Sequence, residues 1–212
     1  MSQMNRPPQI PRPDEANVER RADGEQRLVT TLLVGRLIAP GGDGLCRVRN
    51  MSAGGARIET PYPLRPGDPV RVELRGDTVL EGHIRWISPG TAGMQFDQTI
   101  DTAAVLHGGV SDHEWHHRMP RAPTACSVVA RQSGRIVRAE MLDINPRGAR
   151  LGEVRKPFSD GLLLLSIPLL DPVEAVVRWR NEDMVGVQFT RAIPFAALAE
   201  WLLHPEVRFA HR

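Results

Sequence analysis

The sequence predicts a mainly β protein built from two tandem copies of one small antiparallel β domain, a barrel or a sandwich, with each copy followed by a short helix. Three observations carry this prediction: an internal repeat, strand-like runs at intervals of about 8–12 residues between turn signals, and a helical pattern at the end of each copy. The repeat consists of two blocks that recur at a constant offset of 93 residues. The blocks are Gly55-Ala56-Arg57 with Arg85-Trp86 and Gly93-x-Gln95-Phe96, which return as Gly148-Ala149-Arg150 with Arg178-Trp179 and Gly186-x-Gln188-Phe189.

In the first copy, runs rich in Val, Leu, Ile and Thr alternate with the Gly, Pro, Asn and Asp residues that punctuate strands. Val70, Val72 and Leu74 alternate with Arg71 and Glu73, which is the pattern of a strand with one buried face. We expect strands at residues 28–38, 45–49, 56–59, 70–74, 79–87 and 93–96, a hairpin turn at 41–44, a polar interruption at 50–55 and a short helix at 100–106.

The second copy follows the same plan and ends in a well-marked helix. Pro194 suits the first turn of that helix, and Phe195, Leu198, Trp201 and Leu202 form an apolar stripe behind it. We expect strands at 124–130, 136–142, 162–167, 173–179 and 185–189, a turn at 133–134, a polar interruption at 143–148 and a helix at 194–203. The expected domain bounds are a disordered, proline-rich leader at 1–18, a first domain at 19–107, a linker at 108–116 and a second domain at 117–212.

The composition excludes several classes of protein. The net charge is only +2, which gives no argument for binding to a nucleic-acid polymer. Two cysteines are too few for a disulfide framework, and no apolar run is long enough for a membrane span, so we expect a cytoplasmic protein without membrane insertion. Lys156 is the only lysine among 27 basic residues. A GC-rich genome explains that bias, and so does a need for planar guanidinium groups that bind phosphate or guanine.

Two polar features are candidates for ligand binding. The motif Asn50-x-Ser52-x-x-Gly55 puts short polar side chains and a glycine between two strands, where a ligand or a tight bend can approach the backbone. Arg20, Arg21 and Arg27 lie where the leader meets the first strand. Taken separately, the motif is also explained as a polar turn or bulge, and the arginines as a solvated run balanced by neighbouring acids.

Taken together, these features resemble the PilZ domain family. The resemblance rests on the arginine cluster, the Asn50 to Gly55 motif and its continuation to Glu59, the Pro63 to Gly67 loop, and the repeated Arg-Trp and Gly-x-Gln-Phe block. It runs through residues 20–100 and again through 117–191. It implies a six-stranded antiparallel β-barrel with a C-terminal helix for each copy, and binding of the bacterial second messenger cyclic di-GMP.

The resemblance also implies roles for residues in the first copy. Arg21 and Arg27 would hold phosphate and guanine, and Arg20 would share the phosphate. Asn50 and Ser52 would bond the other guanine edge, and Gly55 would leave space for it. Arginine suits this chemistry because it pairs bidentately with phosphate or with the guanine edge and stacks on purine faces.

The expected function is that of a regulatory adaptor. Binding would order the leader and turn one domain toward a protein partner in flagellar, pilus or polysaccharide machinery, which controls motility, exopolysaccharide or biofilm formation. No nucleophile elbow, phosphate-binding loop or dinucleotide-binding motif occurs in the sequence. We therefore expect no enzymatic activity and no cofactor besides the ligand.

Both copies depart from the family pattern. The family separates two arginines by three residues, but the residue four before Arg27 is Asp23. The corresponding residues of the second copy are Arg118, Arg121, Asp143, Asn145 and Gly148, with Asn145 where the family has serine. We therefore expect the first copy to be the better ligand site and the second to be a partner-binding or structural domain. The alternative function is a degenerate PilZ protein that binds no cyclic di-GMP and acts as a protein-interaction scaffold.

Two further groups have plain structural interpretations. His113, His116 and His117 have the spacing of metal ligands on one helix face, but we expect them to be solvated linker residues without a metal. Trp86 and Trp179 occupy equivalent strand positions, and we expect both to pack in the barrel cores.

Overall fold

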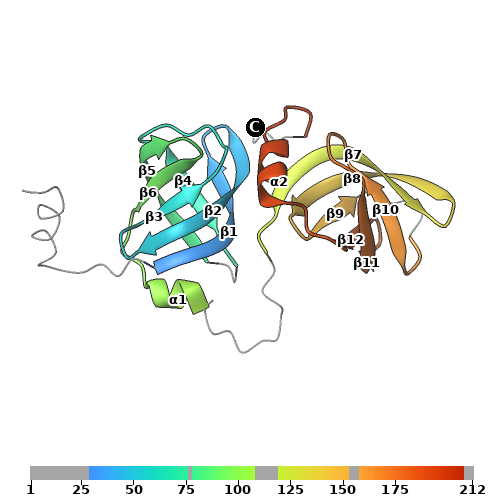
Figure 1. Ribbon diagram of the computed structural model, residues 1–212. Coiled ribbons are helices and arrows are strands. Elements are labelled where there is room, and N and C mark those ends of the chain that lie inside the picture. Colours follow the sequence, from blue (N-terminus) through green and yellow to red (C-terminus); the bar gives the residue numbers. More distant parts are fainter. Residues whose placement is uncertain (1–28, 76–77, 108–118, 153–157, 208–212) are drawn as a thin grey trace, which may run out of the picture.

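Two closed β-barrels follow one another along the chain, as Figure 1 shows for the computed structural model. The structure describes residues 29–75, 78–107, 119–152 and 158–207. The first barrel consists of β1 (Val29–Ala39), β2 (Gly42–Ser52), β3 (Gly55–Glu59), β4 (Pro69–Glu73), β5 (Val79–Ser88) and β6 (Thr91–Phe96), and helix α1 (Thr102–His107) follows it. Its strands pair in the order β1-β2-β3-β6-β5-β4, and β4 pairs with β1 to close the barrel. Each of these pairs is antiparallel.

The second barrel has the same topology. It consists of β7 (Ala122–Gln132), β8 (Arg135–Asn145), β9 (Gly148–Gly152), β10 (Leu162–Ser166), β11 (Val173–Asn181) and β12 (Met184–Phe189), and helix α2 (Phe195–Trp201) follows it. The strand order β7-β8-β9-β12-β11-β10 reproduces that of the first barrel. The predicted fold class, two tandem six-stranded antiparallel barrels that are each followed by a short helix, is confirmed.

Three β-bulges recur in the two barrels at the repeat offset. In β2, Val48 pairs with Ile58 but Asn50 pairs with Arg57, so the intervening residue is extra. The other bulges of the first barrel fall between Thr30 and Leu33 and between Ile84 and Trp86. The second barrel repeats all three at Met141/Asp143, Pro123/Cys126 and Val177/Trp179. Because one extra residue reverses which side chains face the core, each bulge changes the face that the rest of its strand presents.

The first hairpin turn is tighter than the sequence predicts. The chain reverses at Pro40–Gly41, and β2 already begins at Gly42, so the expected turn at 41–44 is wrong. Asp43 lies in β2 opposite Ile38, is buried, and accepts a 2.9 Å hydrogen bond from Nε of Arg36. Asp43, a residue type common in turns, is therefore a buried ion-pair partner. Its burial is tolerated because the guanidinium group of Arg36 neutralises the carboxylate. The expected interruption at 50–55 is also shorter, since β2 continues to Ser52 and the turn occupies only residues 53–54.

Each barrel encloses a core of aliphatic side chains. The largest fully buried side chains in the core of the first barrel belong to Leu37, Met51, Ile58, Leu80 and Ile84, and those of the second barrel and its helix belong to Met141, Ile144, Leu151, Leu163, Leu165 and Leu198. Both cysteines are buried and free. Burial raises the pKa of Cys46 to about 12 and that of Cys126 to about 11, so both thiols are protonated at neutral pH and are poor nucleophiles.

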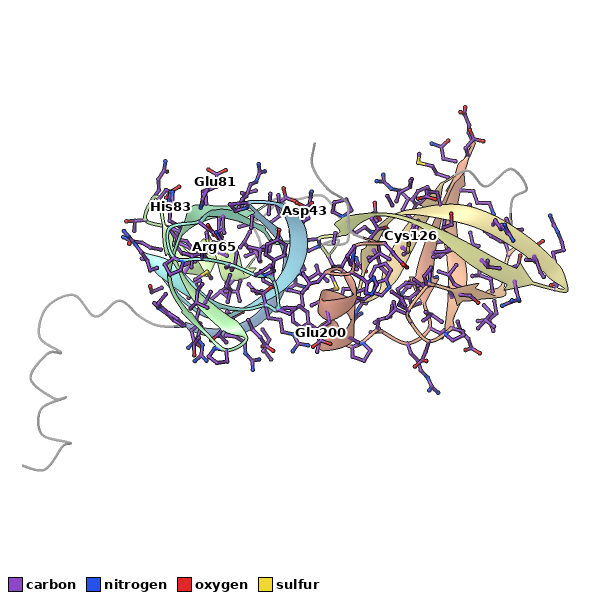
Figure 2. The ribbon with its side chains drawn as sticks, turned by 90° about the horizontal axis from the view of Figure 1, so that it is seen from above. Asp43, Arg65, Glu81, His83, Cys126 and Glu200 are labelled. Atoms are coloured by element: carbon purple, nitrogen blue, oxygen red, sulfur yellow. The ribbon has the colours of Figure 1, made fainter. Side chains whose placement is uncertain are left out.

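Helix α2 lies between the two barrels (Figures 1 and 2). Leu45 of β2 is 1% exposed and belongs to the hydrophobic cluster of the second barrel, not to that of its own. The guanidinium carbon of Arg47 lies 4.2 Å from the ring centroid of Phe195 at the start of α2. Trp201 holds the helix to its own domain, because its indole Nε1 donates a 2.7 Å hydrogen bond to the carbonyl oxygen of Pro168. The barrels are therefore docked through β2 and α2.

Figure 2 shows Asp43 on the side of the first barrel that faces the second, close to this contact. Neither described helix has the length and hydropathy that a membrane crossing needs.

Candidate ligand-binding site

A shallow, open groove lies on the outer wall of the first barrel, where β2, β3, β5 and β6 run side by side. Its volume is about 530 Å³. The residues that line it are Asn50, Ser52, Gly54, Gly55, Ala56, Arg57, Arg85, Trp86, Gly93, Met94 and Gln95. Three predicted site residues, Asn50, Ser52 and Gly55, are thus brought together in one groove.

The bulge in β2 is the reason that the polar motif faces outward. Val48 is fully buried, and strict alternation from Val48 would turn Asn50 and Ser52 into the core. The extra residue in the strand reverses this phase, so Asn50 pairs with exposed Arg57 and Ser52 pairs with Gly55. The polar side chains consequently lie on the outer wall, where no buried polar group has to be satisfied by the core.

Two glycines let the strands and a tryptophan approach closely in the groove. A Cβ atom on Gly55 would lie 2.5 Å from the carbonyl oxygen of Met94, so this glycine is required by the contact of β3 with β6. A Cβ atom on Gly93 would lie 2.1 Å from Nε1 of Trp86. The indole of Trp86 therefore lies against bare backbone, which leaves its other face open to the groove.

The expectation that both tryptophans pack in the cores is wrong. Trp86 is 45% exposed and lines the groove, and Trp179 takes the same position against Gly186 on the outer wall of the second barrel. The cause is the bulge in β5 and its equivalent in β11, which place each tryptophan opposite a glycine on the outward face. The core positions next to the bulges are taken by Ile84 and by Val177.

The groove of the first barrel is cationic and has free hydrogen-bonding capacity. Its lining contains Arg57 and Arg85 and no acidic residue among the described positions. Arg85 donates a hydrogen bond from Nε to the side-chain oxygen of Gln95. Among the described residues, Ser52 makes only a long contact, 3.4 Å from its hydroxyl oxygen to the carbonyl oxygen of Gly55, and the Asn50 amide bonds to none of them. An anionic ligand with polar edges fits this surface.

The sequence prediction missed four residues of this groove whose polar or aromatic side chains suit ligand binding: Arg57, Arg85, Trp86 and Gln95. All four belong to the repeated blocks, so the duplication itself was the available signal. The predicted Arg20, Arg21 and Arg27 lie outside the described residues. The first described residues of β1 are Val29 and Thr30, which pair with Met51 and Asn50.

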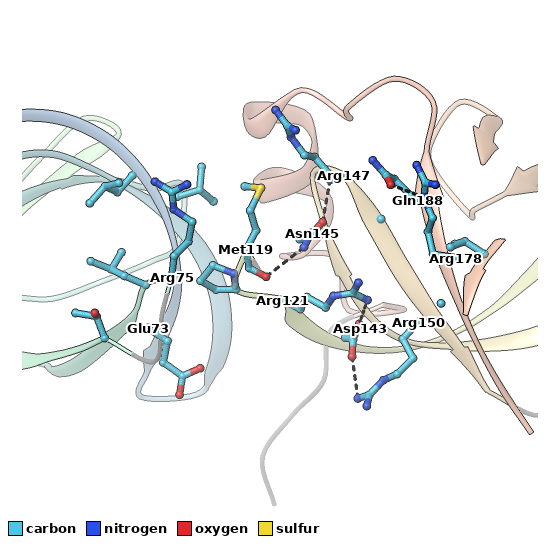
Figure 3. Close-up of a pocket in the computed structure, with 18 of the residues that line it drawn as sticks. Glu73, Arg75, Met119, Arg121, Asp143, Asn145, Arg147, Arg150, Arg178 and Gln188 are labelled. Atoms are coloured by element: carbon cyan, nitrogen blue, oxygen red, sulfur yellow. Dashed lines mark hydrogen bonds and ion pairs between the residues drawn. The ribbon is translucent and has the colours of Figure 1, made fainter. Parts of the chain in front are cut away.

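The second barrel carries an equivalent groove, and this one lies between the two barrels (Figure 3). Its volume is about 1490 Å³. Asp143 takes the position of Asn50, and its carboxylate is held by Arg121 and Arg150, each at 2.8 Å. The side chain of Asp143 is 11% exposed. Asp143 is therefore ion-paired with both Arg121 and Arg150.

Asn145 of the second groove is also engaged. Its amide nitrogen donates a 3.3 Å hydrogen bond to the carbonyl oxygen of Met119, and its side-chain oxygen accepts a 2.9 Å hydrogen bond from the backbone N–H of Arg147. Asparagine at this position thus ties the segment before β7 to the turn after β8, which a serine is too short to do. A Cβ atom on Gly148 would lie 2.4 Å from the carbonyl oxygen of Val187, as in the first copy.

The remaining predicted residues fall outside the part that the structure describes. These are Arg118 and the histidines His113, His116 and His117. Within the described ranges, no group of His, Cys, Asp and Glu side chains has the arrangement of a metal site.

The fold and the two grooves define a tandem β-barrel protein with a polar surface on the outer wall of each barrel. Residues 19–107 match the model of the PilZ domain. The first barrel therefore matches a PilZ domain, and the second barrel repeats the same strand order and bulges. The matched range includes Arg20, Arg21, Arg27 and the whole Asn50 to Gly55 motif.

Several solved structures are similar to this chain. The Borreliella burgdorferi PlzA protein in complex with c-di-GMP is 8% identical over 88% of this chain and 96% of its own, with a TM-score of 0.35. The Bacillus subtilis inhibitor of motility MotI/DgrA is 11% identical over 81% of this chain and 94% of its own, with a TM-score of 0.33. YcgR from Escherichia coli in complex with c-di-GMP is 8% identical over 81% of this chain and 82% of its own, with a TM-score of 0.29. No curated protein matches the sequence.

Proposed function

We propose that this protein is a cyclic di-GMP-binding regulator and that the ligand binds the outer groove of the first barrel. The observation that carries the proposal is the coincidence of the PilZ domain match with a cationic groove in which Asn50 and Ser52 are turned outward. Cyclic di-GMP has two phosphates and two guanines. The groove offers cations for the former and amide, hydroxyl and indole groups for the latter.

Each described groove residue has a distinct part in this proposal. Asn50 and Ser52 hydrogen-bond one guanine edge. Trp86 stacks on a guanine, because its outer face is exposed while its inner face rests on Gly93. Arg57 neighbours Asn50 across the β2–β3 pair and binds phosphate.

The arginines of the leader complete the site in this proposal. Arg27 precedes Val29 by only two residues, and Val29 pairs with Met51, which lies between Asn50 and Ser52 in β2. Two residues span at most about 7 Å of extended chain, so Arg27 is within reach of the groove. Arg20 and Arg21 are farther along the same leader and bind the second phosphate or guanine. Ligand binding then orders the leader across the groove.

The second barrel has a different role in this proposal. Its acid and two arginines are paired with one another, and Asn145 is bonded on both sides of its amide. A ligand would have to break these bonds before it gained its own. We therefore assign the second barrel to partner binding or to structure rather than to the nucleotide.

Calorimetric titration with cyclic di-GMP tests the proposal, and the duplication supplies matched variants. Wild-type protein should bind in the micromolar range, about −8 kcal/mol. Trp86→Ala should weaken binding roughly 5- to 150-fold, because stacking of a base on an aromatic ring contributes about 1–3 kcal/mol. Trp179→Ala, the equivalent change in the second barrel, should leave the affinity within about twofold of wild type if the ligand binds the first barrel.

The outcomes separate the candidate functions. Absence of heat and of a thermal shift with wild-type protein would reject nucleotide binding and leave the protein-interaction scaffold. A loss of affinity in Trp179→Ala but not in Trp86→Ala would move the ligand to the second barrel.

A cellular output is part of the proposal as well. We propose a cytoplasmic adaptor without catalytic activity that acts on a protein of the flagellar, pilus or polysaccharide machinery. Complementation of a deletion strain tests this step. Ser52→Ala should fail to restore the motility or biofilm phenotype under the regulator hypothesis, and it should restore the phenotype fully if the protein is a scaffold that needs no nucleotide.

A further inference from the structure

Because the barrel is duplicated, the side chains at equivalent positions of the two copies can be compared. Side chains that the barrel fold requires recur at the repeat offset, as Gly55 and Gly148 do. Side chains present in only one copy are not required by the barrel topology that the two copies share. Arg75 and Arg147 line the groove between the barrels, and their counterparts at the repeat offset are Pro168 and Gly54. Arg75 and Arg147 are therefore specific to the inter-barrel groove, whereas its Arg150 and Arg178 recur as Arg57 and Arg85 in the first-barrel groove.

The groove carries an excess of positive charge. Its lining contains the arginines Arg71, Arg75, Arg121, Arg147, Arg150 and Arg178 and the acids Glu73 and Asp143. Both acids are already paired, Glu73 with Arg36 and Arg71 and Asp143 with Arg121 and Arg150. Arg75, Arg147 and Arg178 have no acidic partner among the residues that the structure describes, and Arg178 donates a 2.6 Å hydrogen bond from Nε to the side-chain oxygen of Gln188. These three arginines come from both barrels and flank one groove (Figure 3).

Exposed aliphatic side chains accompany the arginines. Leu32 of β1 is 66% exposed and Val79 of β5 is 37% exposed, and both line the first-barrel wall of the groove. Their counterparts in the second barrel are Ala125 and Pro172, so the larger aliphatic groups are again found in one copy only. A surface that combines exposed aliphatic side chains with arginines that have no acidic partner among the described residues is complementary to an acidic, amphipathic partner.

The size of the groove favours a polypeptide over a small molecule. Its volume of about 1490 Å³ is nearly three times that of the first-barrel groove. It also exceeds the range of about 300–1,000 Å³ that is usual for small-molecule sites. It runs from β1, β4 and β5 of one barrel to β8, β9, β11 and β12 of the other, so an occupant touches both barrels at once.

We propose that the inter-barrel groove is the docking site for an acidic, amphipathic segment of a partner protein. Carboxylates of that segment pair with Arg75, Arg147 and Arg178, and its aliphatic side chains cover Leu32 and Val79. Because the segment contacts both barrels, its affinity depends on the barrel arrangement that Leu45 and Arg47 hold against α2. The surface is separate from the nucleotide groove, and the proposal stands whether or not the first barrel binds cyclic di-GMP.

Fluorescence anisotropy of the full-length protein with a short labelled peptide made only of Glu, Leu and Ala tests this proposal. Wild type should bind the peptide, and a peptide with Gln in place of every Glu should not bind. The double variant Arg75→Glu/Arg147→Glu should weaken binding by roughly tenfold or more, because two attractive charges become repulsive. The matched control is Arg65→Glu/Arg135→Glu, which makes the same change of net charge at two exposed arginines outside the groove and should change the affinity by less than about twofold.

Three results would overturn the proposal. The first is the absence of binding to wild type, and the second is an equal loss of affinity in the groove variant and in the control, which would show that only net charge matters. The third is groove-dependent binding of a single-stranded oligonucleotide without binding of the peptide, which would make the surface a nucleic-acid site.

Discussion

Removal of the Leu45 side chain should separate the barrels without unfolding them. Leu45 is 1% exposed, yet it packs in the hydrophobic cluster of the other barrel. Leu→Ala substitutions at buried sites cost about 2–5 kcal/mol. At a domain contact that can partly close around the gap, we expect the lower part of that range, about 2–3 kcal/mol. A loss of this size lowers the docking equilibrium constant roughly 30- to 150-fold.

Two measurements on Leu45→Ala report on this opening. Small-angle X-ray scattering should give a larger radius of gyration than wild type, because the barrels remain folded but are no longer held together. Hydrogen exchange should speed up in α2, which loses its cover from β2. Arg138→Ala is the matched control, since Arg138 occupies the equivalent position in β8 and is exposed there. It should change neither quantity.

The reasoning would be refuted by an unchanged radius of gyration in Leu45→Ala combined with a lower melting temperature of the first barrel. Leu45 would then be a core residue of its own barrel, and the docking contact would depend on other side chains.

Three more predictions follow from single contacts. Gly55→Ala should lower the free energy of unfolding, measured by urea denaturation, by about 1–3 kcal/mol. The reason is that the new Cβ atom would lie 2.5 Å from the Met94 carbonyl oxygen and must push β3 away from β6. Stability equal to that of wild type would contradict this prediction. Asp143→Ala should cost about 1–3 kcal/mol because two arginines lose their carboxylate, whereas Asn50→Ala at the equivalent position of the first barrel should stay within about 0.5 kcal/mol. Because burial raises the pKa of Cys46 to about 12, a thiol reagent at pH 8 should label this cysteine slowly in the native protein and fast after denaturation. Equal labelling rates in the two states would show that the thiol is accessible in the native protein. The raised pKa also makes the stability of the fold depend on pH. The contribution of buried Cys46 to the free energy of unfolding is intact below pH 9 and is lost as the pH rises from 9 toward 12, because the thiol ionises first in the unfolded chain.

The divergence of the two copies explains how one fold came to hold two different surfaces. In the first groove, Asn50 and Ser52 have hydrogen-bonding capacity that the described residues leave unused. In the second groove, the same positions hold the ion-paired Asp143 and the hydrogen-bonded Asn145. The fold tolerates both because these positions lie on the outer wall, where the core packing does not depend on them. The leader arginines, which the first copy needs to complete a nucleotide site, remain a prediction.

The sequence by itself determined the duplication, the number of domains and most of the strands, because a constant repeat offset and the alternation of apolar residues are properties of the chain. It also pointed to the motif from Asn50 to Gly55. The direction of the side chains was decided only by the tertiary structure. Strict alternation would put Trp86 in the core, but the bulge in β5 turns it outward, and a bulge is set by hydrogen bonding to a neighbouring strand.

Long-range contacts could not be predicted from the sequence either. Asp43 has the sequence context of a turn, and it became a buried ion-pair partner because Arg36 lies across the hairpin. Leu45 has the pattern of an ordinary core residue, yet the docking of α2 places it in the other barrel's cluster. The inter-barrel groove, in which Arg75, Arg147 and Arg178 lack an acidic partner among the described residues, exists only because the second barrel is docked against the first. Local pattern fixes which residues form strands, whereas the partners of a side chain depend on segments far away in the chain, and only the packed fold brings these together.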